Sequence, residues 1–223
     1  MPAILRSAVA ICLSFVAGLA ASGEAEAHPH VFVEARMEIV GDAASKLVSV
    51  RNIWRMDELF STSVVLDFDK NANSVLDDDE LAAVGETVRT SIAEWDFYTF
   101  VRVGGQPVKM VAPDEIRTLY ENGQLLLFFE MKAQTPIDMK IQTVSLSNFD
   151  ETFFVAFTYE ETDAFQLVDL PSTCTQGVTV PDEDEAAAQW MASIANLGPD
   201  EEVPDDGVDY SQLLATRVEV KCG

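Results

Sequence analysis

The chain has 223 residues, of which 38 are acidic and 14 are basic, and its formal net charge at pH 7 is −24. This charge argues against binding to nucleic acid or to anionic membrane surfaces, because both of these partners are themselves negatively charged. It suits cationic partners, above all metal ions, although a solvated acidic surface that maintains solubility accounts for most of the carboxylates.

Residues 1–27 have the pattern of a cleaved secretory signal. Arg6 supplies a positive charge, residues 8–21 form an apolar stretch, and residues 25–27, Ala-Glu-Ala, fit a cleavage site. The apolar stretch is too short for a comfortable membrane span, and no cysteine follows it directly to carry a lipid anchor. An uncleaved anchor is the alternative. We therefore expect a periplasmic protein with no membrane insertion after cleavage, whose mature residues 28–223 form a single domain.

The mature chain would begin with His28-Pro29-His30, which contains both histidines of the sequence. Cleavage after Ala27 would leave a free amine and an imidazole on His28, and a second imidazole on His30. Pro29 has no amide proton, which closes off the four-nitrogen square of amino-terminal copper sites. The remaining three nitrogens suit Zn²⁺, Ni²⁺, Co²⁺ or Cu²⁺. The alternative is that both histidines are ordinary surface residues at a frayed end.

A carboxylate from elsewhere in the chain could complete this transition-metal site. Residues 31–40 alternate between apolar and polar side chains, which predicts a strand that begins directly after His30. Alternate side chains of a strand share one face, so His28, His30 and Glu34 are expected on the same side. The candidate carboxylates are Glu34 and Asp150, followed by Asp57 and Glu58.

Further along the chain, a turn at Gly41-Asp42 leads to a second predicted strand at residues 46–55. The helical spacing of apolar residues then predicts two helices, at residues 56–68 and 81–95. A polar loop separates these helices, so the segment has the organisation of a helix–loop–helix.

The polar loop, Asp69 to Glu80, fits the twelve-residue EF-hand calcium loop. Oxygen-bearing side chains occupy positions 1, 3, 5, 9 and 12, and position 7 contributes its backbone carbonyl. Position 6 is Ser74, where a glycine normally makes the sharp turn, and a non-glycine residue at positive φ costs about 1 kcal/mol. The loop therefore either binds calcium with modest affinity or is a degenerate, metal-free loop. The predicted calcium ligands are Asp69, Asn71, Asn73, Val75, Asp77 and Glu80.

The rest of the chain predicts strands and one more helix. Gly104-Gly105 and Asn122-Gly123 are hairpin turn signals. Residues 183–197 have the pattern of a surface helix, and residues 198–209 that of a mobile acidic loop. The predicted strands are residues 97–103, 108–120, 124–132, 140–147, 153–159, 166–170, 177–180 and 215–220.

The order of these elements predicts the α+β class, with mainly antiparallel, sandwich-like sheets. An EF-hand-like helix–loop–helix is inserted at about residues 56–96, and a surface helix lies near the C-terminus. Cys174 and Cys222 remain after cleavage, and an even pair in an exported protein predicts a disulfide that ties the C-terminal strand to the body. A thiolate metal site is disfavoured because the two lack C-x-x-C spacing.

Several stretches together resemble the DUF1007 family. They are the opening His28-Pro29-His30-Val31-Phe32-Val33-Glu34-Ala35, Trp54 with Asp57-Glu58, the EF-like loop, Phe97-Tyr98, and residues 148–157, Asn-Phe-Asp-Glu-Thr-Phe-Phe-Val-Ala-Phe. The resemblance spans nearly the whole mature chain. It departs at Glu34, where the family usually has Asp, and at Ser74, where it often has Gly.

Members of the DUF1007 family are exported bacterial proteins, often described as periplasmic components of an uncharacterised ABC-type transport system. They are associated with nickel/cobalt and zinc transport genes. The resemblance therefore implies that this chain handles a metal ion beside a membrane metal transporter.

Three functional hypotheses follow. The first is a periplasmic, non-enzymatic binding or accessory protein for a divalent transition metal. The second is a structural or interaction module stabilised by calcium, and the third is a copper-dependent enzyme that uses the terminal histidine for oxygen chemistry. The sequence gives the enzyme no further support, because it has no Gly-x-Ser-x-Gly motif, no Ser/His/Asp order and no third histidine.

Overall fold

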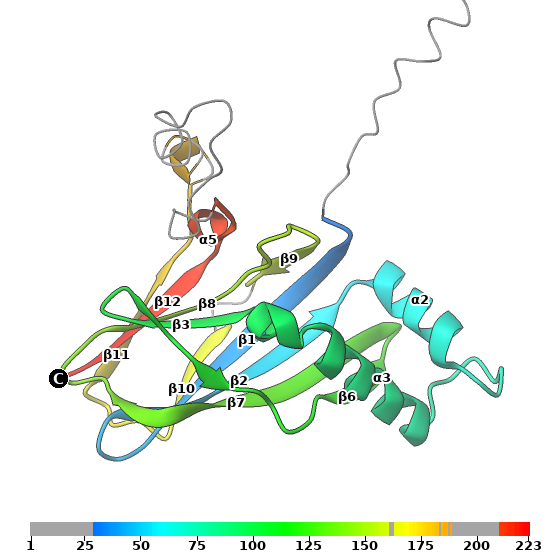
Figure 1. The fold of residues 1–223 in the computed structure, drawn as a ribbon, viewed down its shortest axis with the longest axis horizontal. Coiled ribbons are helices and arrows are strands. Elements are labelled where there is room, and N and C mark those ends of the chain that lie inside the picture. Colours follow the sequence, from blue (N-terminus) through cyan, green and yellow to red (C-terminus); the bar gives the residue numbers. More distant parts are fainter. Residues whose placement is uncertain (1–28, 161–162, 183, 187, 189–209) are drawn as a thin grey trace, which may run out of the picture.

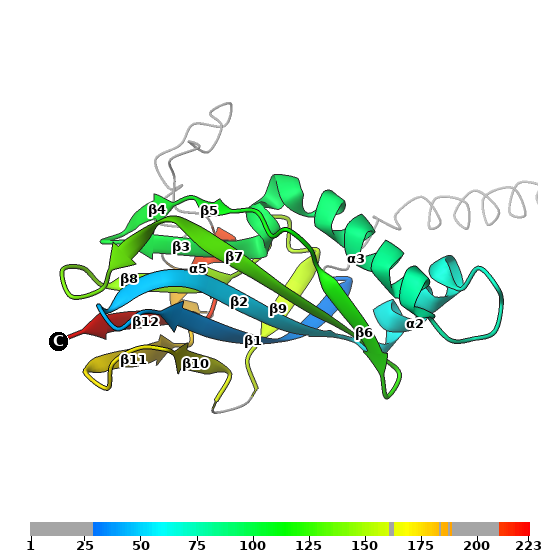
Figure 2. The same cartoon turned by 90° about the horizontal axis from the view of Figure 1, so that it is seen from below.

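The computed structural model describes residues 29–160, 163–182, 184–186, 188 and 210–223. The predicted signal, His28, and most of the predicted surface helix and acidic loop lie outside the described residues. Figures 1 and 2 show two β-sheets stacked on one another, with two helices at the end opposite the C-terminus. Within the described part of the chain, no helix has the length and apolar character needed to cross a membrane.

The first sheet has seven strands built around an antiparallel centre of β1 (Val31–Gly41), β2 (Lys46–Met56) and β7 (Gln124–Asp138). On one side, β9 (Val155–Thr158) and β10 (Phe165–Val168) both pair with β1 in parallel. On the other side, β5 (Met110–Val111) and β6 (Arg117–Glu121) pair antiparallel with β7. The two parallel pairings depart from the antiparallel pattern expected for these strands.

The second sheet has five antiparallel strands. Their spatial order is β11 (Cys174–Thr179), β12 (Arg217–Cys222), β8 (Val144–Asn148), β3 (Thr99–Val103) and β4 (Gln106–Val108). The last strand of the chain, β12, therefore lies inside this sheet and not at its edge.

The core forms between the sheets because their strands alternate apolar and polar residues. In β7, Leu125, Leu127, Phe129 and Met131 are all buried, and the residues between them are at least partly exposed. Residues of both sheets join in one hydrophobic cluster. The predicted α+β class with a sandwich-like arrangement of mainly antiparallel sheets is confirmed.

Two helices follow β2 and cover one end of the first sheet (Figure 2). They are α2 (Glu58–Phe68) and α3 (Asp78–Ser91), joined by a loop at residues 69–77. Asp57 begins α2, because its carboxylate accepts a hydrogen bond of 2.8 Å from Phe60 N–H. Gly85 lets α3 approach the segment before β6, since a Cβ there would lie 2.1 Å from the Ile116 carbonyl oxygen.

Several predicted elements differ from the structure in their bounds, and one short helix was not predicted. Helix α3 ends at Ser91 instead of residue 95, and a short 3₁₀ segment, η1 (Ala93–Tyr98), follows it. Asp96, Phe97 and Tyr98 in this segment have φ values of 48°, 54° and 47°. The long strand predicted at residues 108–120 is divided between β4, β5 and β6, since Pro113 has no N–H for a strand ladder. The short helix α5 (Tyr210–Leu214) was not predicted.

Both predicted hairpin turns are confirmed. Gly104 and Gly105 have φ values of 56° and 83° between β3 and β4, and Asn122 and Gly123 have values of 53° and 84° between β6 and β7. Positive φ at both central residues matches the right-handed twist of the paired strands.

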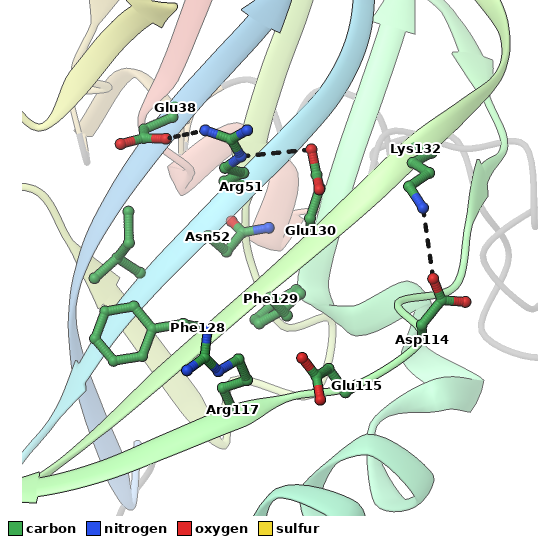
Figure 3. A pocket seen from close by; sticks show the side chains of 11 residues that line it. Glu38, Arg51, Asn52, Asp114, Glu115, Arg117, Phe128, Phe129, Glu130 and Lys132 are labelled. Atoms are coloured by element: carbon green, nitrogen blue, oxygen red, sulfur yellow. Dashed lines mark hydrogen bonds and ion pairs between the residues drawn. The ribbon is translucent and has the colours of Figure 1, made fainter.

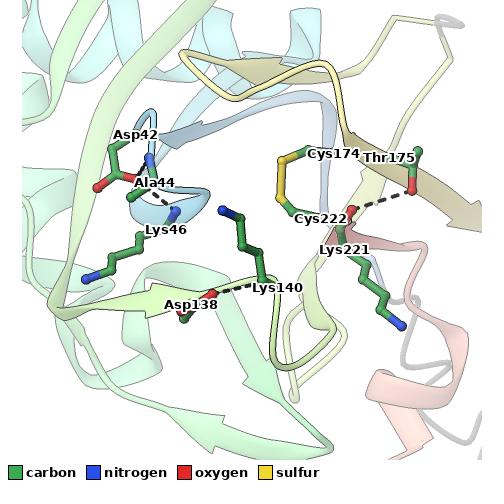
Figure 4. The surroundings of a disulfide bond; sticks show 9 residues. All are labelled: Asp42, Ala44, Lys46, Asp138, Lys140, Cys174, Thr175, Lys221 and Cys222. Carbon is green, nitrogen blue, oxygen red and sulfur yellow. Dashed lines mark hydrogen bonds between the residues drawn. A yellow bond between two sulfur atoms is a disulfide. The ribbon is translucent and has the colours of Figure 1, made fainter.

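The predicted disulfide between Cys174 and Cys222 is also confirmed. The two cysteines lie directly opposite one another in β11 and β12 (Figure 4). Cys222 N–H donates to the Met139 carbonyl at 2.9 Å, and Met139 N–H donates to the Ser45 carbonyl at 3.0 Å. The C-terminal strand is therefore hydrogen-bonded to the turn that follows β7, and that turn is hydrogen-bonded to the turn between β1 and β2.

Candidate functional site

The start of β1 is held against the turn that precedes β9. His30 N–H and Val31 N–H both donate to the Phe154 carbonyl oxygen, at 2.9 and 3.1 Å. The imidazole of His30 is exposed, and its centre lies 5.0 Å from the centre of the Phe154 ring. The second of the two predicted histidine ligands thus belongs to an ordered strand start, while His28 lies outside the described residues.

Asp150 forms the turn that brings Phe154 to His30. Its side chain is buried, and Oδ1 accepts hydrogen bonds from the N–H and hydroxyl of Thr152, at 2.9 and 2.8 Å. Its Oδ2 accepts from Val155 N–H at 2.9 Å. Three acceptor positions of this predicted metal ligand are therefore engaged within its own turn, and Oδ2 retains one lone pair.

Glu34 lies on the same face of β1 as His30, as predicted, but the structure does not bring the two side chains together. They are four positions apart along the strand, which corresponds to about 13 Å between their Cα atoms, and the exposed Phe32 lies between them. Arg55 Nε lies 4.0 Å from a Glu34 carboxylate oxygen. Asp57 is engaged as well, because it accepts from Phe32 N–H at 2.8 Å and begins α2.

No group of three or more His, Cys, Asp and Glu side chains in the described part of the chain is arranged to hold a metal ion. The predicted ligand set includes His28, so this finding concerns only its other members.

A small acidic hollow of about 150 Å³ lies beside the 150–154 turn. Glu94 and Asp96 of η1 and Glu151 of the 150–154 turn line it, together with Trp95, Tyr98 and Phe100. Burial, followed by the negative charges of Asp150 and Glu94, raises the pKa of Tyr98 to about 12. The hollow is therefore a region of negative potential, which favours cations.

An aromatic cluster lies beneath the hollow. The ring of Trp54 lies 4.8 Å from Phe129, 5.0 Å from Phe157 and 6.5 Å from Tyr98, measured between centres. Trp54 is 2% exposed, and its indole N–H has no hydrogen-bond acceptor among the described residues. An unsatisfied buried donor costs about 1–3 kcal/mol, so this N–H is an unusual feature of the interior.

A buried polar network joins the two sheets next to these rings. Asn148 of β8 donates through Nδ2 to Asn52 Oδ1 of β2 at 3.1 Å and to Thr99 Oγ1 of β3 at 3.0 Å. The hydroxyl of Tyr159 donates to Asn148 Oδ1 at 2.6 Å. Burial raises the pKa of Tyr159, which keeps the phenol protonated as a donor.

The loop between α2 and α3, together with the first turn of α3, contains the six predicted calcium ligands. Asp69 accepts from Asn73 N–H at 3.1 Å and from Ser74 N–H at 2.7 Å. Ser74 has a φ of 65°, the positive value that the sequence pattern requires at position 6. Glu80 is 3% exposed, and its two carboxylate oxygens accept from Lys70 N–H at 2.8 Å and Asp77 N–H at 3.0 Å.

The amide groups of Asn71 and Asn73 donate to Asp77 Oδ2 at 2.8 and 3.3 Å, and Asn73 Oδ1 accepts from Val75 N–H at 2.8 Å. The side-chain oxygens of the loop thus face its own N–H groups.

The outward face of the first sheet carries a shallow hollow of about 650 Å³. Figure 3 shows Arg51 between Glu38 and Glu130, at 3.1 and 3.4 Å, and Lys132 paired with Asp114 at 3.5 Å. The hydrogen bond to Glu38 is the main cause that raises the pKa of Arg51. Cations and carboxylates alternate here, so the hollow has no dominant charge that would select a ligand.

The sequence profile of the family described as a protein of unknown function, DUF1007, matches residues 13–222. The chain belongs to the DUF1007 family. An uncharacterised protein of Haemophilus influenzae is 23% identical over 210 residues, which cover 94% of this chain and 98% of that protein.

Among solved structures, this DUF1007 protein has a distant likeness to AChBP from Bulinus truncatus. The two are 9% identical, the match covers 92% of this chain and 95% of that one, and the TM-score is 0.33. No conclusion about the fold or the function rests on a likeness of this degree.

Four of the stretches that carry the family resemblance lie close together in this DUF1007 protein. The start of β1 pairs with the 150–157 segment, and Trp54 and Tyr98 pack against one another and against Phe157 of that segment. Sequence reasoning missed the acidic hollow and the buried Trp54 N–H, which has no acceptor within the part of the chain that the structure describes. The pair Phe97-Tyr98 was a signal for this region, but it was interpreted as the beginning of a strand.

Proposed function

We propose that this DUF1007 protein is a periplasmic binding or accessory protein for a divalent transition metal, and that it works beside a membrane transporter. The observation that carries this proposal is the backbone pairing of His30 and Val31 with Phe154. A histidine fixed at a strand start loses less conformational freedom on binding an ion than one at a frayed terminus.

Charge supports the same proposal. The 150–154 turn that pairs with His30 also contributes Glu151 to the acidic hollow, where Glu94 and Asp96 lie as well. These carboxylates raise the local concentration of cations. The amine and ring of His28 and the ring of His30 provide three nitrogens for Zn²⁺, Ni²⁺, Co²⁺ or Cu²⁺. Asp150 is better placed than Glu34 to add an oxygen, because Glu34 lies beside Arg55.

Calorimetry and metal analysis test the transition-metal site in protein that begins at His28. Wild type is expected to bind about one ion per chain, and His30→Ala to bind it at least tenfold more weakly, because one of three nitrogens is lost. A variant with one glycine added before His28 is the matched control for the amine, since it keeps both imidazoles. Equal uptake by wild type and His30→Ala would contradict the proposal.

We infer that calcium stabilisation of the helix–loop–helix is a second function of this chain, compatible with the first. The observation in its favour is the positive φ of Ser74, which is the conformation that an EF-hand loop needs at position 6, although this residue is not glycine. The carboxylate of Glu80 is buried beside the loop, and its two oxygens accept from the N–H groups of Lys70 and Asp77. A calcium ion bound here would take the place of these donors.

Thermal unfolding with calcium and with a chelator tests this second function. Calcium at a hundredfold excess over its dissociation constant adds about 2.7 kcal/mol, which would raise the melting temperature by several degrees. Glu80→Gln is expected to abolish the calcium effect, whereas Asp79→Asn, at the exposed neighbouring position, keeps it. An identical midpoint with calcium and chelator would show that the loop does not bind the ion.

A further inference from the structure

The edge strand of the second sheet, β11, carries no charge in a strongly acidic protein. Residues 170–181 contain no Asp, Glu, Lys, Arg or His, although the chain has a net charge of −24. In Figure 2, β11 lies at the lower margin of the molecule. Proteins commonly protect an exposed sheet edge with charged side chains, proline or a bulge. The opposite edge strand, β4, contains Pro107, whereas β11 pairs with β12 in unbroken register and contains neither a charge nor a proline.

The backbone of β11 presents hydrogen-bonding groups along this edge. Gly223 N–H donates to the directly opposite Thr173 carbonyl at 3.2 Å, and hydrogen-bonded and non-hydrogen-bonded pairs alternate along an antiparallel ladder. The N–H and C=O groups of Gln176 and Val178 therefore point away from β12. Among the described residues, no strand pairs with β11 on this side. Val178 and Val180 are 49% and 73% exposed, so the described part of the chain leaves the edge open.

A disulfide fixes this edge strand to the sheet. Cys174 begins β11 and is bonded to Cys222, the last residue of β12. Gln176 ties the strand to the first sheet as well, because its Nε2 donates to the Phe165 carbonyl oxygen at 2.9 Å. The strand already has the extended conformation that a further strand needs, so pairing with it costs little conformational freedom.

The sequence of β11 allows it to pair with a copy of itself. An antiparallel partner on a two-fold axis at Gly177 sets Gln176 opposite Val178 of the second copy. Both positions have outward-pointing backbone groups, so hydrogen bonds form on either side of the axis. Thr175 then lies opposite Thr179 of the second copy, and Thr–Thr pairs are favourable cross-strand pairs.

Gly177 leaves room for the close approach on the axis. A Cβ added to this glycine meets no atom within 4 Å, so its surroundings are open in the single chain. In the paired strands the two copies of Gly177 form a non-hydrogen-bonded pair, with about 4.5 Å between their Cα atoms. This position is the place where the two strands lie nearest to one another without side chains between them.

Charge favours association through this edge over association through other surfaces. Two copies of a chain with a net charge of −24 repel one another where their acidic surfaces meet. Pairing through β11 brings no charged strand residues together. The neighbouring strand β12 exposes Arg217, Glu219 and Lys221, which are two cations and one carboxylate, so the surroundings of the edge are not acidic either.

We propose that β11 is a dimerisation edge, and that two copies of this chain pair antiparallel through it about a two-fold axis at Gly177. The second sheets of the two copies then continue into one sheet across the axis. The interface uses no residue of the proposed transition-metal site or of the calcium loop, so it is independent of both.

Sedimentation equilibrium of protein that begins at His28 tests the dimer, at about 100 µM protein and about 0.15 M salt, where charge repulsion is screened. Wild type is expected to be a dimer. Val178→Pro removes an outward-pointing N–H from each copy, a position where an edge strand tolerates proline, and is expected to raise the dissociation constant at least tenfold. Val178→Thr keeps the shape and the N–H, so it is the matched control and should remain a dimer.

Circular dichroism and thermal unfolding establish that each variant is folded. A monomeric wild type would overturn the proposal. A folded Val178→Pro that dimerises as tightly as wild type would overturn it as well.

Cysteine variants test the register of the pairing, and the native cysteines are already joined to one another. Gly177→Cys brings two thiols together on the axis, at a Cα separation that a disulfide can span. The two thiols of Thr179→Cys are four positions apart along the paired strands, about 13 Å, which a disulfide cannot span. After mild oxidation, intact mass is expected to show a covalent dimer of Gly177→Cys and none of Thr179→Cys. Absence of the Gly177→Cys dimer, or equal cross-linking of both variants, would overturn the proposal.

Discussion

Asp150 and Tyr98 show how single residues shape the candidate site. Asp150 uses both carboxylate oxygens to fold the turn that presents Phe154 to the start of β1. Tyr98 lines both the acidic hollow and an apolar cavity of about 340 Å³ between α2, α3 and the first sheet. Asp150 thus fixes where the start of β1 lies, and Tyr98 borders both a cation-attracting surface and an apolar interior.

Asp150→Asn tests the structural role of this carboxylate. The amide retains one acceptor but directs N–H groups at Val155 N–H or Thr152, where two donors would face each other. We expect a loss of about 1–3 kcal/mol in the free energy of unfolding, measured with urea. Glu151→Gln, at the exposed neighbouring position, should change it by less than about 0.5 kcal/mol. Equal losses in both would refute the role assigned to Asp150.

The raised pKa of Tyr98 predicts how stability changes at alkaline pH. The folded phenol ionises at about 12, whereas an unfolded tyrosine ionises near 10. The contribution of Tyr98 is therefore complete below pH 10 and is lost as pH rises through 12. Urea unfolding at several pH values should show a smaller alkaline loss in Tyr98→Phe than in wild type. Parallel curves for the two proteins would contradict this expectation.

At the scale of elements, alternation and turn chemistry predicted the long strands and both hairpins. Two features of the fold were not predicted: the break between α3 and β3, and the parallel strand pairings. Asp96, Phe97 and Tyr98 adopt positive φ without a glycine among them, so the sequence gives no signal for the break between α3 and β3. The parallel pairings of β9 and β10 with β1 are contacts across more than a hundred residues, which periodicity cannot detect.

The same limit applies to the candidate site. The pattern His28-Pro29-His30 directs attention to the start of β1, but the residue that pairs with His30, Phe154, comes from the distant 150–154 turn. Glu34 was predicted from strand periodicity alone, which gives the face of a side chain but not its distance from His30 or its neighbour Arg55. The cavity under α2 and α3 depends on tertiary packing and has no signature in one sequence.

Gly85 sets the distance between α3 and the first sheet. Alanine is the better helix former by about 1 kcal/mol, yet its Cβ would meet the backbone oxygen of Ile116. We expect Gly85→Ala to destabilise the protein by about 1–3 kcal/mol in urea unfolding, as overpacking does. Thr90→Ala on the exposed side of α3 is the control and should be near neutral. A stabilised Gly85→Ala would show that helix propensity outweighs the close approach.

At the scale of the whole molecule, the disulfide closes a segment that contains the residues between β11 and β12. The cysteines are 48 residues apart, and the chain-entropy model gives about 4 kcal/mol for a closed loop of this size. Replacing both cysteines with serine is expected to lower the free energy of unfolding by about 2–5 kcal/mol. Wild type under reducing conditions is the control and should lose a similar amount. A loss below about 1 kcal/mol would mean that strand pairing alone holds this part of the sheet.

The position of β12 has a kinetic consequence. This strand lies between β11 and β8, and β11 pairs with no other described strand. The β11 strand can therefore join the second sheet only after β12 has paired with β8. Two of the five strands of this sheet thus depend on a single pairing, and a folding chain in which β12 has not yet paired exposes the edge of β8.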